Sequence, residues 1–476
     1  MQHQTEAVES IAPRHEFGSS HHLNICVVGT GYVGLTTGVC LAYLGHQVTC
    51  LDVDEKKIEL LRNGKVPIHE PGLDDVLCAS SSNINFTTDP CAALSSAEVI
   101  FIAVGTPSLP DGNPNLQYVT AASEQIGKHL RDGFTVVVNK STVPIGSANW
   151  VETVVRDSYE ESRGVRSNGI FAVASNPEFL REGSALHDTF YPDRVVLGSD
   201  NAEALEVLYT LYRPIIEQSF AAPAFLPRPE GLGAVPVVTA NLTSAELIKY
   251  AANAFLSVKI SFANEVGHLA ERVGADINQV VRGMGLDSRI GSRFLQAGLG
   301  WGGSCFGKDT AALVATAREY GIAMRIVQGA RDVNYEQRER VVSILLSEMK
   351  ILKGKTIGIL GLAFKPHTDD LRDAPAFDIG RRLADRGAKV RGHDPIALDR
   401  ARRERPDAGI HFCDTPEAVA KDADALILAT EWPQYMDLNW HDLAASMRSP
   451  LILDGRNCLG RCKLEQAGFR YLGLGV

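Results

Sequence analysis

The stretch LNICVVGTGYVGLTTGVCLAYLGHQVTCLDVD, residues 23–54, decides the fold class of this chain. It begins with a short apolar run and passes through a glycine-rich turn, GTGYVG. A run of small and apolar residues typical of a buried helix follows, and a second apolar run ends at Asp52. A strand, a glycine turn, a helix and a second strand in this order predict a βαβ dinucleotide-binding unit.

Three glycines and one acid give this unit its chemistry. Gly29 permits a tight turn, Gly31 lets backbone amides approach a pyrophosphate, and Gly34 allows the helix to pack closely. The helix N-terminus favours an anion at the same place. Asp52 is placed to accept hydrogen bonds from ribose hydroxyls and would repel a 2′-phosphate. We therefore predict NAD as the cofactor, the alternative being a glycine turn with a purely structural role.

The rest of the chain continues this pattern and then changes it. Apolar strands at AEVIFIAVGTP, FTVVVNKSTVP and FAVASNPEF alternate with helical stretches, which predicts a parallel, doubly wound sheet. A long helix is predicted from Thr243 to about Val273, with Thr243 and Glu246 at the spacing of a capping box. A second α/β pattern begins at KTIGILGLAF.

These patterns predict an α/β protein with two Rossmann-like doubly wound domains joined by a long central helix. The predicted divisions are a disordered extension at 1–22, a first α/β domain at 23–236, a helical middle domain at 237–350 and a second α/β domain at 351–476.

The composition excludes several classes of function. The net charge of -10 gives no general attraction to nucleic acid or to anionic membranes, and no apolar run approaches the roughly 20 residues that span a bilayer. The nine cysteines form no C-x-x-C pair and suggest a reducing compartment, so we expect a cytoplasmic protein. No residue set suggests a resident metal.

The segment GLGWGGSCFGKDT, residues 298–310, carries the strongest catalytic signal. Cys305 stands just before a predicted helix, whose N-terminus stabilises an anion by roughly 0.3–1 kcal/mol. With Lys308 nearby, we expect its thiol to ionise below the free value of about 8.5. A thiolate can attack an aldehyde and form a thiohemiacetal. The alternative is a buried, inert cysteine in a packing loop.

Lys249 and Asn253 lie four residues apart and share one face of the long helix. An ammonium and an amide at this spacing could stabilise an alkoxide or another oxyanion. From spacing alone, a lysine that reaches solvent and a surface amide remain the simpler interpretation.

Two further loops follow apolar strands, at the sheet edge where ligands collect in doubly wound folds. KSTVPIG contains Thr142, and NPEFLREGSA contains Glu178 and Glu182. We expect these side chains where substrate and nicotinamide meet, the alternative being helix caps and ordinary loop acids.

Taken together, these stretches resemble the UDP-glucose/GDP-mannose dehydrogenase family from about residue 23 to the C-terminus. The resemblance is carried, in order, by GTGYVGL, PIHEPGL, VGTP, KSTVPIG, NPEFLREG, AELIKYAANAFLSVKISFANE, DSRIGSRFL, GGSCFGKD and GLAFKPHTDDLRDAP. It implies an NAD-binding first domain, a dimerisation role for the helical middle domain, and a UDP-sugar-binding second Rossmann-like domain. It also implies a homodimer or a higher homo-oligomer.

The resemblance implies roles for individual residues. Cys305 is similar to the family's nucleophile, with catalytic roles also for Lys249, Asn253, Asp309, Thr142 and Glu178. The implied cofactor contacts are Gly29, Gly31, Tyr32, Val33, Gly34, Asp52, Lys57, Thr106, Thr142, Glu182, Lys308 and Arg372. The implied substrate contacts are Glu178, Phe179, Leu180, Lys249, Asn253, Lys259, Arg289, Phe294, Gly302, Lys365 and Arg456, with Arg289 acting across the dimer interface.

The implied reaction is a two-step oxidation of UDP-glucose to UDP-glucuronate by NAD, through a cysteine thiohemiacetal and thioester. Three alternatives stay open: the same chemistry on GDP-mannose or a UDP-N-acetylhexosamine, a one-step alcohol dehydrogenase that has no use for the thiol, and a non-catalytic NAD-binding protein.

Overall fold

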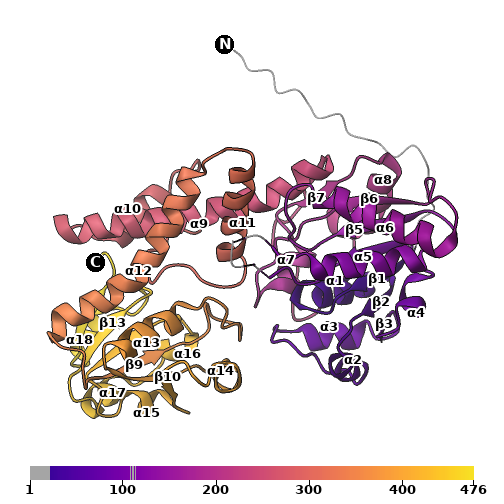
Figure 1. The fold of residues 1–476 in the computed structure, drawn as a ribbon. Helices are drawn as coiled ribbons and strands as arrows, with labels where there is room; N and C mark the ends of the chain where they lie inside the picture. Colours follow the sequence, from indigo (N-terminus) through magenta and orange to yellow (C-terminus); the bar gives the residue numbers. More distant parts are fainter. Residues whose placement is uncertain (1–21, 108, 110–111, 113) are drawn as a thin grey trace.

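A computed structural model describes residues 22–107, 109, 112 and 114–476. The disordered extension predicted for residues 1–22 lies outside the described residues, apart from His22. Figure 1 shows two α/β lobes with a group of helices running between them.

The first lobe is built on an eight-stranded sheet in the order β3-β2-β1-β4-β5-β6-β7-β8. Its strands are β1 Asn24–Val28, β2 Gln47–Leu51, β3 Ile84–Thr87, β4 Val99–Ile102, β5 Thr135–Asn139, β6 Phe171–Ser175, β7 Val195–Gly198 and β8 Val237–Ala240. All neighbours are parallel except β6 and β7. The strand order reverses between β1 and β4, which is where doubly wound sheets bind a dinucleotide.

Helices cover both faces of this sheet. They are α1 Tyr32–Tyr43, α2 Glu55–Arg62, α3 Leu73–Ala79, α4 Pro90–Leu94, α5 Gln117–His129, α6 Ser147–Arg163, α7 Ala185–Phe190 and α8 Ala202–Ile216. Two separate hydrophobic cores result, one on each face. Helix α1 is buried along most of its length because its residues are small or apolar all round.

The helical middle region consists of α9 Leu242–Val273, α10 Ile277–Gly285, α11 Phe306–Glu319 and α12 Arg325–Met349. The predicted long helix is present, but its predicted capping box is wrong. The cap is Asn241, whose side chain accepts from the backbone N–H of Ser244, so Thr243 already lies inside the helix. Glu246 turns away from its own helix and caps α6 instead.

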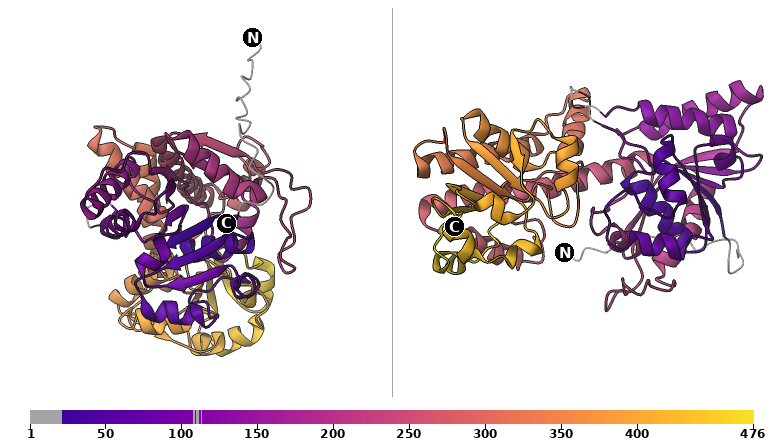
Figure 2. Two further views of the ribbon diagram at one scale, coloured as in Figure 1. Left: turned by 90° about the vertical axis from the view of Figure 1, so that its right-hand side faces the viewer. Right: turned by 90° about the horizontal axis from the view of Figure 1, so that it is seen from below.

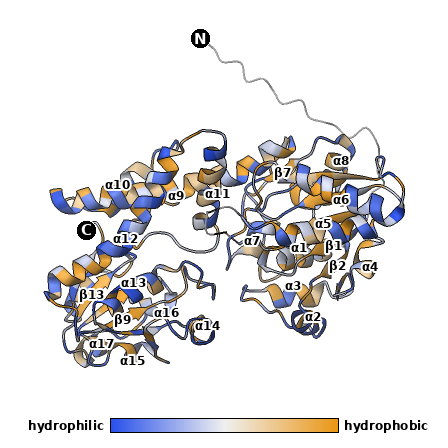
Figure 3. Ribbon diagram, viewed as in Figure 1, coloured by the Kyte–Doolittle hydropathy of each residue, from blue (hydrophilic) through white to orange (hydrophobic). Residues whose placement is uncertain are grey.

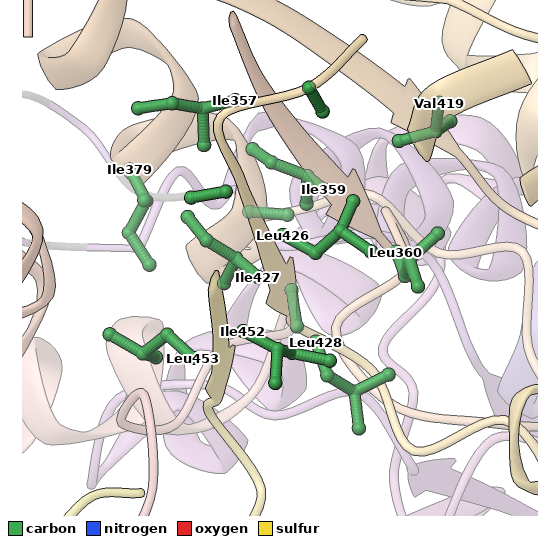
Figure 4. Packing of buried hydrophobic residues seen from close by; sticks show 14 of the residues in the cluster. Ile357, Ile359, Leu360, Ile379, Val419, Leu426, Ile427, Leu428, Ile452 and Leu453 are labelled. Carbon is green, nitrogen blue, oxygen red and sulfur yellow. The ribbon is translucent and has the colours of Figure 1, made fainter. Parts of the chain in front are cut away.

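The second lobe is a six-stranded parallel sheet in the order β11-β10-β9-β12-β13-β14. Its strands are β9 Thr356–Leu360, β10 Lys389–His393, β11 Ile410–Phe412, β12 Ala425–Leu428, β13 Leu451–Asp454 and β14 Arg470–Gly473. Its helices are α13 Pro375–Asp385, α14 Leu398–Glu404, α15 Pro416–Ala420, α16 Pro433–Met436, α17 Trp440–Ser446 and α18 Arg461–Gln466. Isoleucine and leucine side chains of β9, β12 and β13 fill its core (Figure 4).

The six strands of the second sheet follow the same order as β1 to β6 of the first, but the acid that follows the second strand has a different environment in each lobe. Asp52 follows β2 in the first lobe and keeps part of its side chain exposed at the crevice. Asp394 follows the corresponding strand, β10, and is buried. Its carboxylate accepts from the backbone N–H of Leu362 at 2.8 Å and from the indole N–H of Trp432 at 3.0 Å.

The structure confirms the predicted fold class of two Rossmann-like domains joined by a long helix. The strands inside each lobe are largely apolar, whereas the covering helices alternate between apolar and polar residues (Figure 3). Two further views show the central helices running from one lobe to the other (Figure 2). The loop after β6 and the loop after β9 meet between the lobes, where Arg372 forms an ion pair with Glu182 at 2.9 Å.

Candidate active site

A cavity of about 830 Å³ lies between the lobes, beside helix α9. It is lined by the loop after β6, one face of α9, the glycine-rich loop before α11 and the loop after β9. The predicted site residues that line it are Glu178, Phe179, Leu180, Glu182, Lys249, Asn253, Lys259, Phe294, Gly302, Cys305 and Lys365.

Cys305 is the N-cap residue of α11, so its thiol lies at the start of that helix. The expectation that this thiol ionises below its free value is wrong. Burial raises its pKa, and the nearby ammonium of Lys249 opposes this shift only in part. Lys308 was the cation expected to activate the thiol, but it forms an ion pair with Asp309 at 2.7 Å.

A buried ion pair joins the central helix to the first sheet. The ammonium of Lys249 lies 3.0 Å from the Glu178 carboxylate, and both side chains are almost fully buried. Burial opposes the charge of Lys249, but Glu178, with Cys305 and Asp309, keeps its pKa above the ordinary value. Burial likewise opposes the charge of Glu178, but Lys249 and the backbone N–H of Leu180 hold the Glu178 pKa below its ordinary value.

Asn253 lies one turn further along α9 and donates its side-chain N–H to Asp309 at 2.6 Å. Asp309, in the first turn of α11, is completely buried. Helices α9 and α11 therefore bring Lys249, Asn253, Asp309 and Cys305 into one cluster at the cavity.

The loop after β5 is fixed at two points. The Thr106 hydroxyl donates to the carbonyl oxygen of Thr142 at 2.7 Å. The Glu246 carboxylate, from α9, accepts from the backbone N–H groups of Gly146 at 2.6 Å and Ala148 at 2.9 Å. Thr142 therefore sits in a loop anchored to both the sheet and the central helix.

The glycine turn after β1 fits a dinucleotide. Gly29 has a φ of +99°, and a side chain there would meet the carbonyl oxygen of Ala103 at 2.7 Å. A Cβ at Gly31 would meet no atom within 4 Å, which leaves space for a pyrophosphate beside the backbone amides. Asp52 accepts from Thr30 and forms an ion pair with Lys57 at 3.4 Å, at the edge of the crevice.

Tyr32 and Val33 form the first turn of α1, and the tyrosine connects this turn to the substrate-side loop. The Tyr32 hydroxyl donates to Glu70 and accepts from the backbone N–H of Gly183 at 2.6 Å. Glu70 also accepts from the N–H of Ala185, at the start of α7. The glycine turn and the loop after β6 are thus one hydrogen-bonded unit.

In the ion pair between the lobes, two carboxylates share one arginine. Arg372 bonds both Glu182 and Asp370, at 2.9 and 2.8 Å. Burial, and then the neighbouring Asp370, raises the pKa of Glu182 to about 7. Glu182 also accepts from the hydroxyl of Thr368 at 3.2 Å, so three side chains of the second lobe face it.

Two predicted substrate residues lie away from the cavity lining. Arg289 is 86% exposed and pairs with Asp287 at the surface, so a single chain does not bring it to its own cavity. Arg456 lies behind the rim, where its guanidinium donates to the carbonyl oxygens of Ala429 and Phe364.

Sequence reasoning missed a cation in the cavity wall. The guanidinium of Arg194 stacks on the Phe179 ring, 3.6 Å from its centre, and faces the cavity. Arg194 directly precedes β7, a position at which a charged residue usually reaches solvent. Its role depends on the fold placing Phe179 beneath it, and the local sequence carries no signal of that contact.

Comparison with known proteins matches all three parts of the chain to one family. The NAD binding domain, central domain and UDP binding domain of the UDP-glucose/GDP-mannose dehydrogenase family match residues 23–216, 243–336 and 358–461. This chain belongs to that family. It is accordingly an NAD-dependent dehydrogenase, and the open turn at Gly31 fits this cofactor.

Individual relatives align with this chain over nearly its full length. UDP-glucose 6-dehydrogenase TuaD of Bacillus subtilis is 44% identical, over 95% of this chain and 93% of its own. A UDP-glucose dehydrogenase structure from Pyrobaculum islandicum has a TM-score of 0.85 at 39% identity, over 98% of this chain and 99% of its own. A UDP-D-ManNAc dehydrogenase from Pyrococcus horikoshii has a TM-score of 0.80 at 27% identity, over 95% and 99%.

No helix in the described part of this dehydrogenase has the length and apolar character needed to cross a membrane.

Two glycines of the NAD turn should separate stability from cofactor binding. In Gly34→Ala the new methyl overlaps the carbonyl oxygen of Gly29, so we expect a loss of about 1–3 kcal/mol of stability and a lower melting temperature. In Gly31→Ala the methyl meets no protein atom, so the melting temperature should stay unchanged while the NAD dissociation constant rises. Calorimetric melting and NAD titration check both, and equal melting temperatures would contradict the packing argument.

Glu246 should make stability depend on pH. Burial raises its pKa to about 7, so between about pH 4.5 and 7 the folded chain holds a proton that the unfolded chain releases. This contribution to stability is present at low pH and is lost as the pH rises through 7. Relative to Glu246→Gln, the wild-type melting temperature should therefore fall from pH 5 to pH 7.5. The exposed Glu319→Gln should track the wild type, and parallel wild-type and Glu246→Gln curves would refute the assignment.

Proposed function

We propose that this enzyme oxidises the primary alcohol of UDP-glucose to the carboxylate of UDP-glucuronate. The balanced reaction takes one alcohol, two NAD⁺ and one water to one carboxylate, two NADH and three protons. Bound NAD supplies the acceptor for one hydride in each oxidation. The protein has to move protons, stabilise oxyanions, hold the aldehyde and admit water only at the end.

In the first oxidation, Glu178 accepts the proton of the substrate hydroxyl, since its lowered pKa keeps it ionised. Lys249 and Asn253 face the cavity from α9 and stabilise the oxygen as negative charge develops on it. Because Lys249 is already bonded to Glu178, the base and the oxyanion donor are held in fixed relation.

In the second stage, the sulfur of Cys305 bonds to the aldehyde carbon, and the thiol proton passes to the carbonyl oxygen. This route suits a thiol whose pKa is raised, because the thiol proton leaves only as the carbon–sulfur bond forms. The second oxidation converts the thiohemiacetal to a thioester. Water, guided by Asp309 and Thr142, then breaks the carbon–sulfur bond and releases the carboxylate.

The observation that carries this proposal is the convergence of Lys249, Asn253 and Cys305 on one cavity between the lobes, with the buried Asp309 hydrogen-bonded to Asn253. An NAD-binding protein without activity needs none of these four groups. A one-step alcohol dehydrogenase has no use for the thiol. UDP-glucose is the favoured substrate because the relatives from Bacillus subtilis and Pyrobaculum islandicum carry that name. The UDP-D-ManNAc dehydrogenase structure keeps a second nucleotide sugar as the alternative.

The first test is the yield of NADH per UDP-glucose consumed. The wild type should give a ratio near two, and Cys305→Ser should lower uronate formation by at least about a hundredfold, since a hydroxyl is a far weaker nucleophile. Absorbance at the NADH band and chromatography of the nucleotide products measure both. The exposed cysteine variant Cys78→Ser should behave as the wild type.

Other outcomes would decide against this proposal. A ratio near one would show that oxidation stops at the aldehyde. Turnover with UDP-N-acetylhexosamine or GDP-mannose in place of UDP-glucose would transfer the same chemistry to another substrate. A normal rate of uronate formation by Cys305→Ser would eliminate the covalent route.

We also infer that the enzyme is a homodimer that works in the cytoplasm. Apolar side chains stand exposed at seven-residue spacing along α9, at Phe255, Phe262 and Leu269, so they form a stripe along one face of the helix. The exposed Arg289 is available for the contact across the dimer interface that the family resemblance implies. All nine cysteines lie in the described part of the chain and are free thiols, as a reducing compartment permits.

The stripe gives a direct test of assembly. Phe262→Glu places a charge in its middle, and we expect the mass measured by light scattering to fall to that of one chain. Glu319→Lys, on an exposed helix end, should keep the wild-type mass. An unchanged mass for Phe262→Glu would exclude this face as the contact.

A further inference from the structure

Lys140, the residue directly after β5, is a buried lysine that the proposed mechanism does not use. Only 8% of its surface is exposed. Its ammonium donates to the side-chain oxygen of Asn176 at 2.8 Å and to the main-chain oxygen of Asn176 at 3.4 Å. Tyr212 donates to the same side-chain oxygen at 2.6 Å and places its ring beside the ammonium. Burying an ammonium among neutral partners costs stability. A charge kept at this position therefore points to a role in function.

The charges that face Lys140 belong to the catalytic cluster. The Glu178 carboxylate favours the protonated form of Lys140, and the ammonium of Lys249 disfavours it. Lys249 in turn faces Glu178, Cys305 and Asp309. Lys140, Glu178 and Lys249 therefore form a series of charges that alternate in sign. Lys249, the last of the series, faces the proposed nucleophile Cys305. Burial lowers the pKa of Lys140 to about 8, so the ammonium still predominates at neutral pH.

The sheet explains how this residue reaches that position. Strands β5 and β6 are parallel neighbours, with Asn139 opposite Ser175. The next residue on each strand, Lys140 and Asn176, therefore leave the same edge of the sheet side by side. Asn176 stands two residues before Glu178 and also donates to the carbonyl oxygen of Val196 on β7. The ammonium thus holds the base of the turn that carries Glu178.

We propose that Lys140 is a positioning residue that keeps Glu178 ionised and turned toward Lys249, ready to accept the proton of the substrate hydroxyl. The inference rests on the proposed function of Glu178. Because Lys140 adds a second ammonium near Glu178 beside that of Lys249, the carboxylate stays charged although it is buried.

The decisive variant is Lys140→Met, which keeps the length of the side chain and removes its charge. Since a buried charge is replaced by an apolar group, the melting temperature should stay level or rise. On the acidic limb of the pH profile we expect kcat/KM to fall by about tenfold, the equivalent of about one pKa unit at Glu178. The acidic limb of the kcat/KM profile should move to higher pH, because Glu178 then protonates more readily. Lys140→Arg keeps the charge and should leave that limb in place.

A double-mutant cycle separates action through Glu178 from a general structural role. In a Glu178→Gln background, Lys140→Met should cause little further loss and no shift of the limb. Losses that multiply in the double variant would overturn the proposal. So would an unshifted acidic limb, or a drop in melting temperature that parallels the loss of activity. Should Lys140→Met fail to fold, Lys140→Gln provides the same comparison.

Two controls make the test of Lys140 independent of which nucleotide sugar is the substrate. Lys128→Met, at an exposed site on α5, should match the wild type in activity and pH profile. NADH formation by the wild type with UDP-glucose reports on the proposed function alone. The ratio of variant to wild type reports on Lys140, with whichever nucleotide sugar the wild type oxidises.

Discussion

The buried ion pair between Lys249 and Glu178 is the interaction on which the site depends. It joins the central helix to the loop after β6, and both side chains are almost fully buried, so removal of either partner leaves an uncompensated charge that costs about 3–5 kcal/mol. Such a pair is a weak source of net stability, because desolvation offsets most of the attraction. Its value is geometric, since it fixes a carboxylate and an ammonium 3.0 Å apart beside the cavity.

The surrounding contacts keep this pair in place from several directions. Glu246, three residues before Lys249 on the same helix, holds the loop that carries Thr142. Asn253, four residues after it, holds Asp309. One helix therefore carries three successive polar contacts, each to a different segment of the chain. A long helix suits this task because its hydrogen bonds are satisfied internally and its side chains repeat at fixed spacing.

Much of this architecture can be predicted from local sequence patterns. The rest depends on contacts between residues far apart in the chain, which local patterns do not reveal. The βαβ unit at residues 23–54 predicts its own fold because glycine spacing and apolar runs act over short distances. The partner of Glu246 lies almost a hundred residues earlier in the chain, so its sequence spacing suggested a helix cap that does not form. The raised pKa of Cys305 has the same origin, because burial by distant segments outweighs the nearby ammonium of Lys249. Arg194 and Lys140 gain importance only from the residues placed beside them.

The contrast between Asp52 and Asp394 has a consequence for the order of events. Since backbone amides and the Trp432 indole already saturate Asp394, the second lobe has no spare acceptor there for a ribose. Within the described residues, each cavity is therefore served by a single dinucleotide crevice, in the first lobe. A four-electron oxidation then requires the spent cofactor to leave and a fresh one to enter midway. In the proposed mechanism, the sulfur–carbon bond to the half-oxidised sugar acts as a tether during that exchange, and it stops a reactive aldehyde from escaping through the same opening.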